Sequence, residues 1–408
     1  MSPDPADTFA PTPRLAPVVL AGATAFLDLY ATQPLLPFLA RTFKATPLEV
    51  SLTLTAGTLG VALAAPIVGR FADRVGRKRV IVGAAFALAV ATFLAATSTS
   101  LWQLIAWRFV QGLFTPGIFA VTIAYIHEKW PPSRAGAATA AYVSGTVVGG
   151  FSGRLIAGVV AADVSWRSSF LVLGALNLAA ACLLWTKLPG DLRSALAPHE
   201  KSRLGALAGL LRNPRLVSAY AVGFGVLFSL VAMFTYVTFL LAAPPYGLST
   251  VALGSVFFVY LVGAVITPIV GPVIDRYGHR HGMGVAVAFG VVGALLTLGG
   301  NLLAILVGLA ICATGVFIAQ VAASSFVGAT AERDRGLAVG LYATFYYVGG
   351  SAGGSLPALF WERWGWPACV LLVVAVQLAV AVVSMSCWSD RRFVRLSRPD
   401  MPADGNEF

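Results

Sequence analysis

The sequence predicts an all-α integral membrane protein with twelve transmembrane helices in two pseudo-symmetric six-helix bundles. Three observations predict this fold: the composition, a count of long apolar runs, and a basic loop that recurs in the second half of the chain. Hydrophobic residues make up 58% of the 408 residues and charged residues 11%, whereas soluble domains carry roughly 25% charge. A chain so poor in charge cannot cover itself with a surface compatible with water, so it must lie in a membrane.

Twelve apolar runs are long enough to cross a bilayer, because a helix needs about 20 residues to span roughly 30 Å of hydrocarbon. The first six are 16–40, 48–69, 79–98, 102–126, 135–161 and 166–187. The second six are 216–242, 250–272, 282–300, 302–328, 336–360 and 365–388. We therefore expect an N-terminal tail (1–14), an N-terminal bundle (15–187), a central loop (188–215), a C-terminal bundle (216–388) and a C-terminal tail (389–408). A short amphipathic helix is expected in the central loop around Leu204–Leu211.

The basic residues of the loops predict the orientation in the membrane. Suppose that both termini and the turn at 69–79 are cytoplasmic. Of the 28 Lys and Arg residues, four then fall in outer loops and two within spans, which leaves 22 on the cytoplasmic side (28 − 4 − 2). We therefore expect both termini to be cytoplasmic, in a protein of the inner (plasma) membrane. We further expect the protein to be a monomer. Its basic loops would face anionic lipid headgroups. Because the net charge of +11 is spread over short loops, it does not indicate a nucleic-acid partner.

The chain contains an internal repeat. The turn at 69–79 reads GRFADRVGRKR, and a weaker copy, GPVIDRYGHRH, begins 202 residues later at 271–281. Each copy has a Gly, an Asp four residues on, an Arg, a second Gly and a basic run. The tripeptide VGG recurs at 148–150 and 348–350. Such repeats predict two halves of parallel topology, with a binding site between them near the middle of the membrane.

Four segments resemble motifs of the major facilitator superfamily, in the order that the family has them. They are the loop signature at 69–79, a fourth-helix motif at 108–112 (RFVQG), an antiporter fifth-helix motif at 145–153 (GTVVGGFSG) and a first-helix motif of twelve-helix drug/proton antiporters at 28–37 (DLYATQPLLP). The resemblance covers the whole chain. Two positions depart from the antiporter pattern: Gly150 stands where that motif has proline, and Arg154 stands where it has the following glycine.

The resemblance implies a secondary active transporter that works by alternating access. The leading expectation is proton-coupled export of small amphipathic compounds. Proton-coupled transport of a sugar or small organic-anion metabolite remains an alternative, and a non-transporting membrane sensor is an alternative of another class. We expect no enzymatic activity, no metal site and no cofactor. The sequence has no GxxxxGK[ST] or HExxH motif, and its four His residues lack metal-ligand spacing.

Asp28 is the carboxylate predicted deepest within a span, about twelve residues or roughly 18 Å from its cytoplasmic end. An ionisable group at that depth is costly and indicates a functional site. Arg108 is predicted at a similar depth on a neighbouring helix, where a salt bridge would keep Asp28 ionised until a proton or substrate breaks it. We expect Asp28 to carry the proton with Arg108 as its counter-ion. The alternative is a structural partner that locks two helices together.

A substrate cavity is expected between the halves. Arg154 has two possible roles there: a structural or snorkelling position, or a contact with an anionic substrate group. The first span adds Thr32 and Gln33, beside two prolines that should bend its outer end. The spans of the second half contain no charge, and their candidate cavity residues are Tyr236, Tyr260, Gln320, Tyr342, Tyr346 and Tyr347. These side chains serve either core packing or contact with a flat, amphipathic substrate.

The resemblance adds a gating role to the turn at 69–79, which by charge alone would set the orientation. The candidate cytoplasmic gate residues are Gly69, Asp73, Arg74, Gly76, Arg77, Glu128, Arg134, Asp275, Arg276 and Gly278. We expect Gly69 to end the second span and Gly76 to allow the reversal. Asp73 is expected either to cap a helix or to pair with a cation such as Arg134.

Small residues form two stripes that let helix backbones approach closely. They are Gly145, Gly149 and Gly153 in the first half, and the pairs Gly349/Gly353 and Gly350/Gly354 in the second. One interpretation is static packing of helices. The other is a seam on which the two halves rock during transport.

Overall fold

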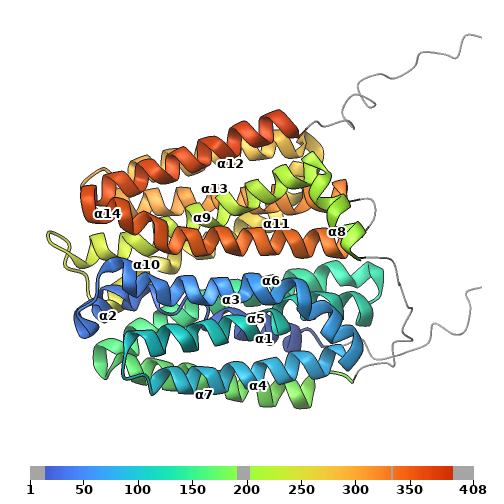
Figure 1. Cartoon of the computed structure of the whole chain (residues 1–408), viewed down its shortest axis with the longest axis horizontal. Coiled ribbons are helices and arrows are strands. Elements are labelled where there is room, and N and C mark those ends of the chain that lie inside the picture. The colour runs from blue at the N-terminus through green and yellow to red at the C-terminus, as the bar shows by residue number, and fades with distance from the viewer. Residues whose placement is uncertain (1–13, 191–202, 332–333, 389–408) are drawn as a thin grey trace, which may run out of the picture.

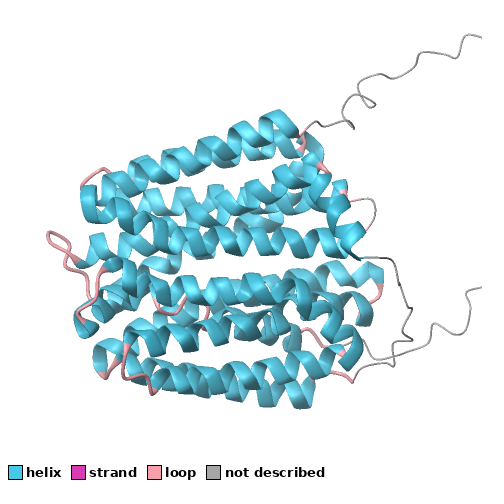
Figure 2. Cartoon of the chain, in the orientation of Figure 1, coloured by secondary structure: helices cyan, strands magenta, loops and turns pink. Residues whose placement is uncertain are grey.

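The computed structural model describes residues 14–190, 203–331 and 334–388, and within these residues the elements are helical (Figures 1 and 2). Residues 1–13 of the expected N-terminal tail, residues 191–202 of the central loop and the expected C-terminal tail (389–408) lie outside the described residues, so these parts stay predictions. The described part of the expected amphipathic segment forms α8 (Arg203–Arg212).

The N-terminal half contains seven α-helices and one 3₁₀ helix. The first span consists of α1 (Ala16–Leu27), η2 (Gln33–Leu35) and α2 (Leu36–Phe43). The next five spans are α3 (Pro47–Val75), α4 (Arg77–Ala96), α5 (Leu101–Lys129), α6 (Pro132–Asp163) and α7 (Trp166–Lys187).

The C-terminal half repeats this pattern. It begins with α9 (Pro214–Ala242), followed by a span made of α10 (Thr250–Val256), η3 (Phe257–Tyr260) and α11 (Leu261–Tyr277). The last elements are α12 (His279–Leu296), α13 (Leu302–Thr330) and α14 (Arg335–Cys387).

The predicted twelve-span fold is confirmed. Among the described residues, 9 helices are individually long and apolar enough to cross a membrane. One of them, α14, contains two spans, because Gly365 has non-helical dihedrals (φ 70°, ψ −156°). The interrupted first and eighth spans complete the count (8 + 2 + 2).

The helices form two bundles that meet along α3 and α14, which lie side by side in Figure 1. The helices α2 and α10 lie toward one end of the molecule, at the left of Figure 1, and α8 lies at the opposite end. We call these the α2 end and the α8 end. Residues far apart in the sequence thus meet along the plane between the halves, where the binding site was expected.

The first span is broken rather than merely bent. Helix α1 stops at Leu27 with Asp28 as its C-cap, and helical structure resumes at Gln33. Pro34 explains the break, because proline lacks a backbone N–H and its ring clashes with the carbonyl four residues earlier, that of Tyr30. The break therefore begins before the prolines and lies at the level of the predicted proton site.

The repeated loop forms the same reversal in both halves. Gly76 has φ 106° and Gly278 has φ 91°, conformations that residues with a Cβ rarely adopt. Helix α3 continues to Val75, so the expectation that Gly69 ends the second span is wrong. One glycine within a helix costs only about 1 kcal/mol, too little to end a span that the membrane stabilises.

The two glycine stripes pack within each half. Gly145, Gly149 and Gly153 face the backbone of α1, and Gly349 and Gly353 face that of α9. A Cβ on Gly149 would lie 2.5 Å from a Cα atom of α1. The expected seam between the halves is therefore wrong for these residues, because their smooth faces are already occupied by a helix of the same half. Of the second expected pair, Gly350 faces side chains of α9, whereas Gly354 meets α3 across the contact between the halves. Two further glycines lie at that contact: Gly158 meets α10 and Gly254 meets α6.

Replacement of Gly149 by Leu tests the close packing of α1 on α6. A side chain there must displace a helix backbone, so we expect a loss of about 2 kcal/mol of stability. Thermal unfolding in detergent would show it as a lower midpoint. Gly83→Leu is the matched control, since a Cβ at Gly83 meets nothing within 4 Å. Equal midpoints for the two variants would contradict the packing described here.

Candidate functional site

A cavity of about 310 Å³ lies between the two halves. Its wall is built from α1, the broken segment that follows it and α6 of the N-terminal half, and from α9, η3, α13 and α14 of the C-terminal half. Aromatic and aliphatic side chains dominate the wall. The non-aromatic polar side chains are those of Thr146, Arg154, Gln320 and Ser324. The cavity is thus largely apolar, with one cationic group.

The halves are hydrogen-bonded to each other on the side of the cavity nearer the α2 end. Among the described residues, these bonds are Gln33 to Thr235 (3.2 Å), Ser51 to Tyr236 (3.3 Å), Thr55 to the carbonyl of Ser351 (3.1 Å) and Thr58 to Ser351 (2.8 Å). From Arg154 the cavity wall continues along α6 and α13 toward the α8 end, where Ser324 is exposed. The molecule is therefore closed at the α2 end.

Arg154 is held in a fixed position at the plane between the halves. The residue is 3% exposed, its Nε donates to Gln33 Oε1 (2.8 Å) and its Nη1 donates to the carbonyl of Gly150 (2.6 Å). Its guanidinium carbon lies 4.7–4.8 Å from the ring centres of Tyr30, Phe257 and Tyr260. These rings come from both halves, so the cation contacts both bundles at once.

Asp28 lies inside the N-terminal bundle rather than in the cavity wall. The residue is 1% exposed, and its Oδ2 accepts hydrogen bonds from Thr92 Oγ1 (2.5 Å) and Asn177 Nδ2 (2.6 Å). Its Oδ1 is buried and has no hydrogen-bond partner in the part of the chain that the structure describes. Tyr30, two residues on, does line the cavity. The carboxyl group is thus enclosed by α4 and α7, close to the broken segment that reaches the substrate space.

Arg108 makes no direct ion pair with Asp28 among the described residues, so the expected salt bridge is wrong. Its guanidinium instead donates hydrogen bonds to the carbonyls of Leu29 (2.6 Å) and Thr53 (3.3 Å) and to the side chain of Gln111. Gln111 in turn donates to Thr92 Oγ1 (2.9 Å). The two charged residues are therefore joined by a chain of hydrogen bonds through Gln111 and Thr92.

The other predicted cavity residues divide into three groups. Tyr260, Gln320, Tyr346 and Tyr347 line the cavity together with Arg154, and Gln33 borders it through its bond to Arg154. Thr32, Tyr236 and Tyr342 are buried elsewhere. The hydroxyl of Tyr236 donates to the carbonyl of Gly354 (2.9 Å) near the closed α2 end.

Three aromatic wall residues, Phe26, Tyr30 and Phe317, were not among the cavity candidates. The sequence could have indicated Tyr30 as a wall residue, because it lies two residues after Asp28 in the motif at 28–37. Phe26 and Phe317 had no such indication beyond their positions in apolar spans.

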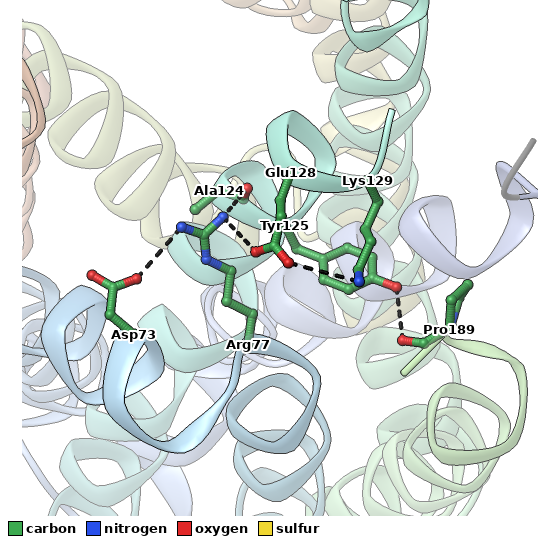
Figure 3. Close-up of polar contacts among 7 residues, drawn as sticks. All are labelled: Asp73, Arg77, Ala124, Tyr125, Glu128, Lys129 and Pro189. Atoms are coloured by element: carbon green, nitrogen blue, oxygen red, sulfur yellow. Dashed lines mark hydrogen bonds and ion pairs between the residues drawn. The ribbon is translucent and has the colours of Figure 1, made fainter. Parts of the chain in front are cut away.

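Arg77 organises the turn between α3 and α4, as Figure 3 shows. It lies 3.4 Å from Asp73 and 3.1 Å from Glu128, and it also donates to the carbonyl of Ala124 (2.5 Å). The partner of Asp73 is therefore Arg77 and not Arg134. Because Arg77 begins α4 and Glu128 belongs to α5, this cluster joins helices within the N-terminal half at the α8 end.

The equivalent turn of the second half is less fully described. The guanidinium of Arg276 lies 5.5 Å from the ring centre of Tyr277, and the side chain of Asp275 is outside the described part. Arg74 is exposed. No group of three His, Cys, Asp or Glu residues that could hold a metal ion occurs among the described residues.

Comparison with known proteins gives consistent matches over nearly the whole length. The family model of the Major Facilitator Superfamily matches residues 18–267 and 241–403. The inner membrane transport protein YnfM of Escherichia coli (strain K12) is 32% identical over 377 residues, 91% of this chain and 90% of that protein. The MFS-type transporter YybF of Bacillus subtilis (strain 168) is 30% identical over 365 residues, 89% of this chain and 90% of that protein.

Solved structures with low sequence identity share the fold. The nucleoside transporter NupG has a TM-score of 0.76 at 14% identity, with 92% of this chain and 100% of that chain covered. A bacterial homologue of the human lysosomal transporter Spinster, in an inward-facing and unoccupied conformation, has a TM-score of 0.75 at 16% identity, with 92% and 98% covered. The human organic anion transporter MFSD10 has a TM-score of 0.68 at 18% identity, with 91% and 98% covered.

Replacement of Arg77 by Gln tests the cluster at the α8 end. The side chain is partly exposed, so we expect a loss of only about 1 kcal/mol of stability. The loss should shrink at high salt, because ions screen exposed charge pairs. Thermal unfolding at low and high salt measures both effects. The exposed Arg70, changed to Gln, is the control; a loss as large for Arg70→Gln would contradict a specific role for Arg77.

Proposed function

We propose, on the premise that the chain belongs to the Major Facilitator Superfamily, that it couples the transport of small amphipathic compounds to proton movement by alternating access. Its relatives are transporters and not enzymes, and the chain is a multi-pass membrane transporter. Beyond this, the proposal concerns the driving ion, the type of substrate, the direction of transport and the orientation of the protein in the membrane. We propose export, with the α8 end in the cytoplasm of a cell whose inner membrane holds the protein.

The observation that carries proton coupling is the incomplete hydrogen bonding of Asp28. A buried carboxylate is costly, and a buried oxygen without a partner adds to that cost. Around Asp28, two buried oxygens have no hydrogen-bond partner among the described residues: Oδ1 of Asp28 itself and Oδ1 of Asn177. A proton on Asp28 Oδ1 would supply an O–H donor, and the amide oxygen of Asn177 is the acceptor that lacks one. A single proton would then satisfy both atoms, while Asn177 Nδ2 continues to donate to Asp28 Oδ2.

The hydrogen-bond chain connects the protonation state of Asp28 to the wall of the cavity. Protonation of Asp28 would remove the negative charge that faces Thr92, Gln111 and, through them, Arg108. Arg108 holds the carbonyl of Leu29, which lies in the broken part of the first span. The neighbouring Tyr30 lines the cavity. A change at Asp28 would therefore alter the support of a segment that forms part of the binding site.

The arrangement of the halves supports alternating access. Their hydrogen bonds lie nearer the α2 end, and the cavity extends toward the α8 end. The basic loops at the α8 end favour a cytoplasmic location for it. In that orientation the structure corresponds to a state that admits a compound from the cytoplasm. Opening the α2-end contacts would release the compound outside.

The cavity itself supports an amphipathic substrate. Its volume of about 310 Å³ is at the lower end of the roughly 300–1,000 Å³ typical of small-molecule sites. Rings such as those of Tyr30, Tyr260 and Tyr346 offer flat apolar surface with hydroxyl groups at the edge. A sugar would require more polar partners than this wall provides. The organic-anion alternative is favoured by one specific residue, Arg154.

Replacement of Asp28 by Asn tests proton coupling, because Asn has a similar shape but cannot ionise. Binding of a fluorescent amphipathic dye should remain. Dye accumulation driven by a pH gradient in proteoliposomes should fall at least tenfold and lose its dependence on pH. Proton movement is followed in the same vesicles with a pH-sensitive probe.

Asp163→Asn provides the control, since Asp163 is an exposed carboxylate at the end of α6. That variant should accumulate dye as the unmodified protein does. Undiminished, gradient-dependent accumulation by the Asp28→Asn variant would exclude Asp28 as the proton carrier.

A further inference from the structure

We infer that the transported compound carries an anionic group, such as a carboxylate, that binds Arg154 while its apolar body lies against the cavity rings. The inference deepens the proposed transport function and names its substrate class. It does not depend on proton coupling, since the anion would bind at a site separate from Asp28.

The first reason is that the charge of Arg154 is not compensated. Among the described residues, no Asp or Glu side chain forms an ion pair with it. Other cations do have acidic neighbours: Arg108 is joined by hydrogen bonds to Asp28, and Arg77 contacts Asp73 and Glu128. A buried cation without a counter-charge is costly, and ring faces offset only part of that cost. An anion that enters the cavity would supply the missing charge.

The second reason is that Arg154 has unused donors. A guanidinium has five N–H groups, and the structure gives two hydrogen bonds, from Nε to Gln33 and from Nη1 to Gly150. Three N–H groups (5 − 2), including both on Nη2, therefore have no hydrogen-bond partner in the described part of the protein. A carboxylate accepts two parallel N–H bonds from such a group. Arg154 is also part of the cavity wall, so the donors belong to a side chain that a ligand can reach.

The third reason is that the guanidinium is already positioned. Gln33 and Gly150 fix two of its nitrogens, and the three rings around it restrict its rotation. Little conformational entropy is then lost when an anion binds. The rings of Tyr30, Phe257 and Tyr260 come from both halves, so a bound anion would interact with both bundles. This is the position expected for the substrate of a two-halved transporter.

The test compares an aromatic acid with its neutral counterpart. Isothermal titration calorimetry on the full chain in nanodiscs measures the affinity for 2-naphthoate and for 2-naphthamide, at one neutral pH and without a gradient. Because charge-assisted bonds are stronger than neutral ones, we expect the acid to bind roughly 10- to 100-fold more tightly. Arg154→Gln should remove this preference, and Arg363→Gln, a change at an exposed arginine at the α2 end, should retain it.

Equal affinity for acid and amide, or no binding of the acid at millimolar concentration, would overturn the inference without any variant. A preference that persists in a monodisperse Arg154→Gln protein would overturn it as well. The Asp28→Asn variant separates this proposal from proton coupling. It should keep the acid preference, and unimpaired proton-driven transport by that variant would overturn the coupling proposal alone.

Discussion

The break in the first span between Leu27 and Gln33 is the constraint on which the site depends. An unbroken helix would use its backbone carbonyls internally, whereas the broken segment leaves the carbonyl of Leu29 for Arg108. Backbone that departs from a helix at this depth must find partners within the protein. The same segment places Asp28 toward α4 and α7 and Tyr30 toward the cavity. One local interruption thus joins the proposed proton site to the proposed substrate site.

The two buried arginines have different environments and, in this account, different roles. Arg108 donates to two backbone carbonyls and to Gln111, so its charge serves to hold helices together around Asp28. Arg154 keeps unused donors beside aromatic rings. Gln33 accepts from Arg154 and donates to Thr235, so the cation shares a side chain with a contact that closes the α2 end. A ligand bound to Arg154 would therefore be linked, through the side chain of Gln33, to the hydrogen bond with Thr235 at the closed α2 end.

The sequence was sufficient for the features that repeat along the chain. Hydrophobic runs predicted the spans, and the Asp-Arg-x-Gly turn predicted matching reversals, which Gly76 and Gly278 provide. It was insufficient where two helices had to be placed relative to each other. The glycine stripe around Gly149 predicts that another helix backbone comes close, but it does not show which helix. In the structure that helix is α1, which belongs to the same half. The depth of Arg108 likewise did not reveal that Gln111 and Thr92 would stand between it and Asp28.

The central claim is that Asp28 takes up a proton inside the membrane. Infrared difference spectroscopy measures this directly, because a protonated buried carboxyl absorbs separately from ionised carboxylates. We expect acidification of the full chain in lipid to produce a protonated-carboxyl band that is absent from the Asp28→Asn variant and present in Asp163→Asn. The same band in Asp28→Asn, or no such band in the unmodified protein across the physiological pH range, would contradict the account.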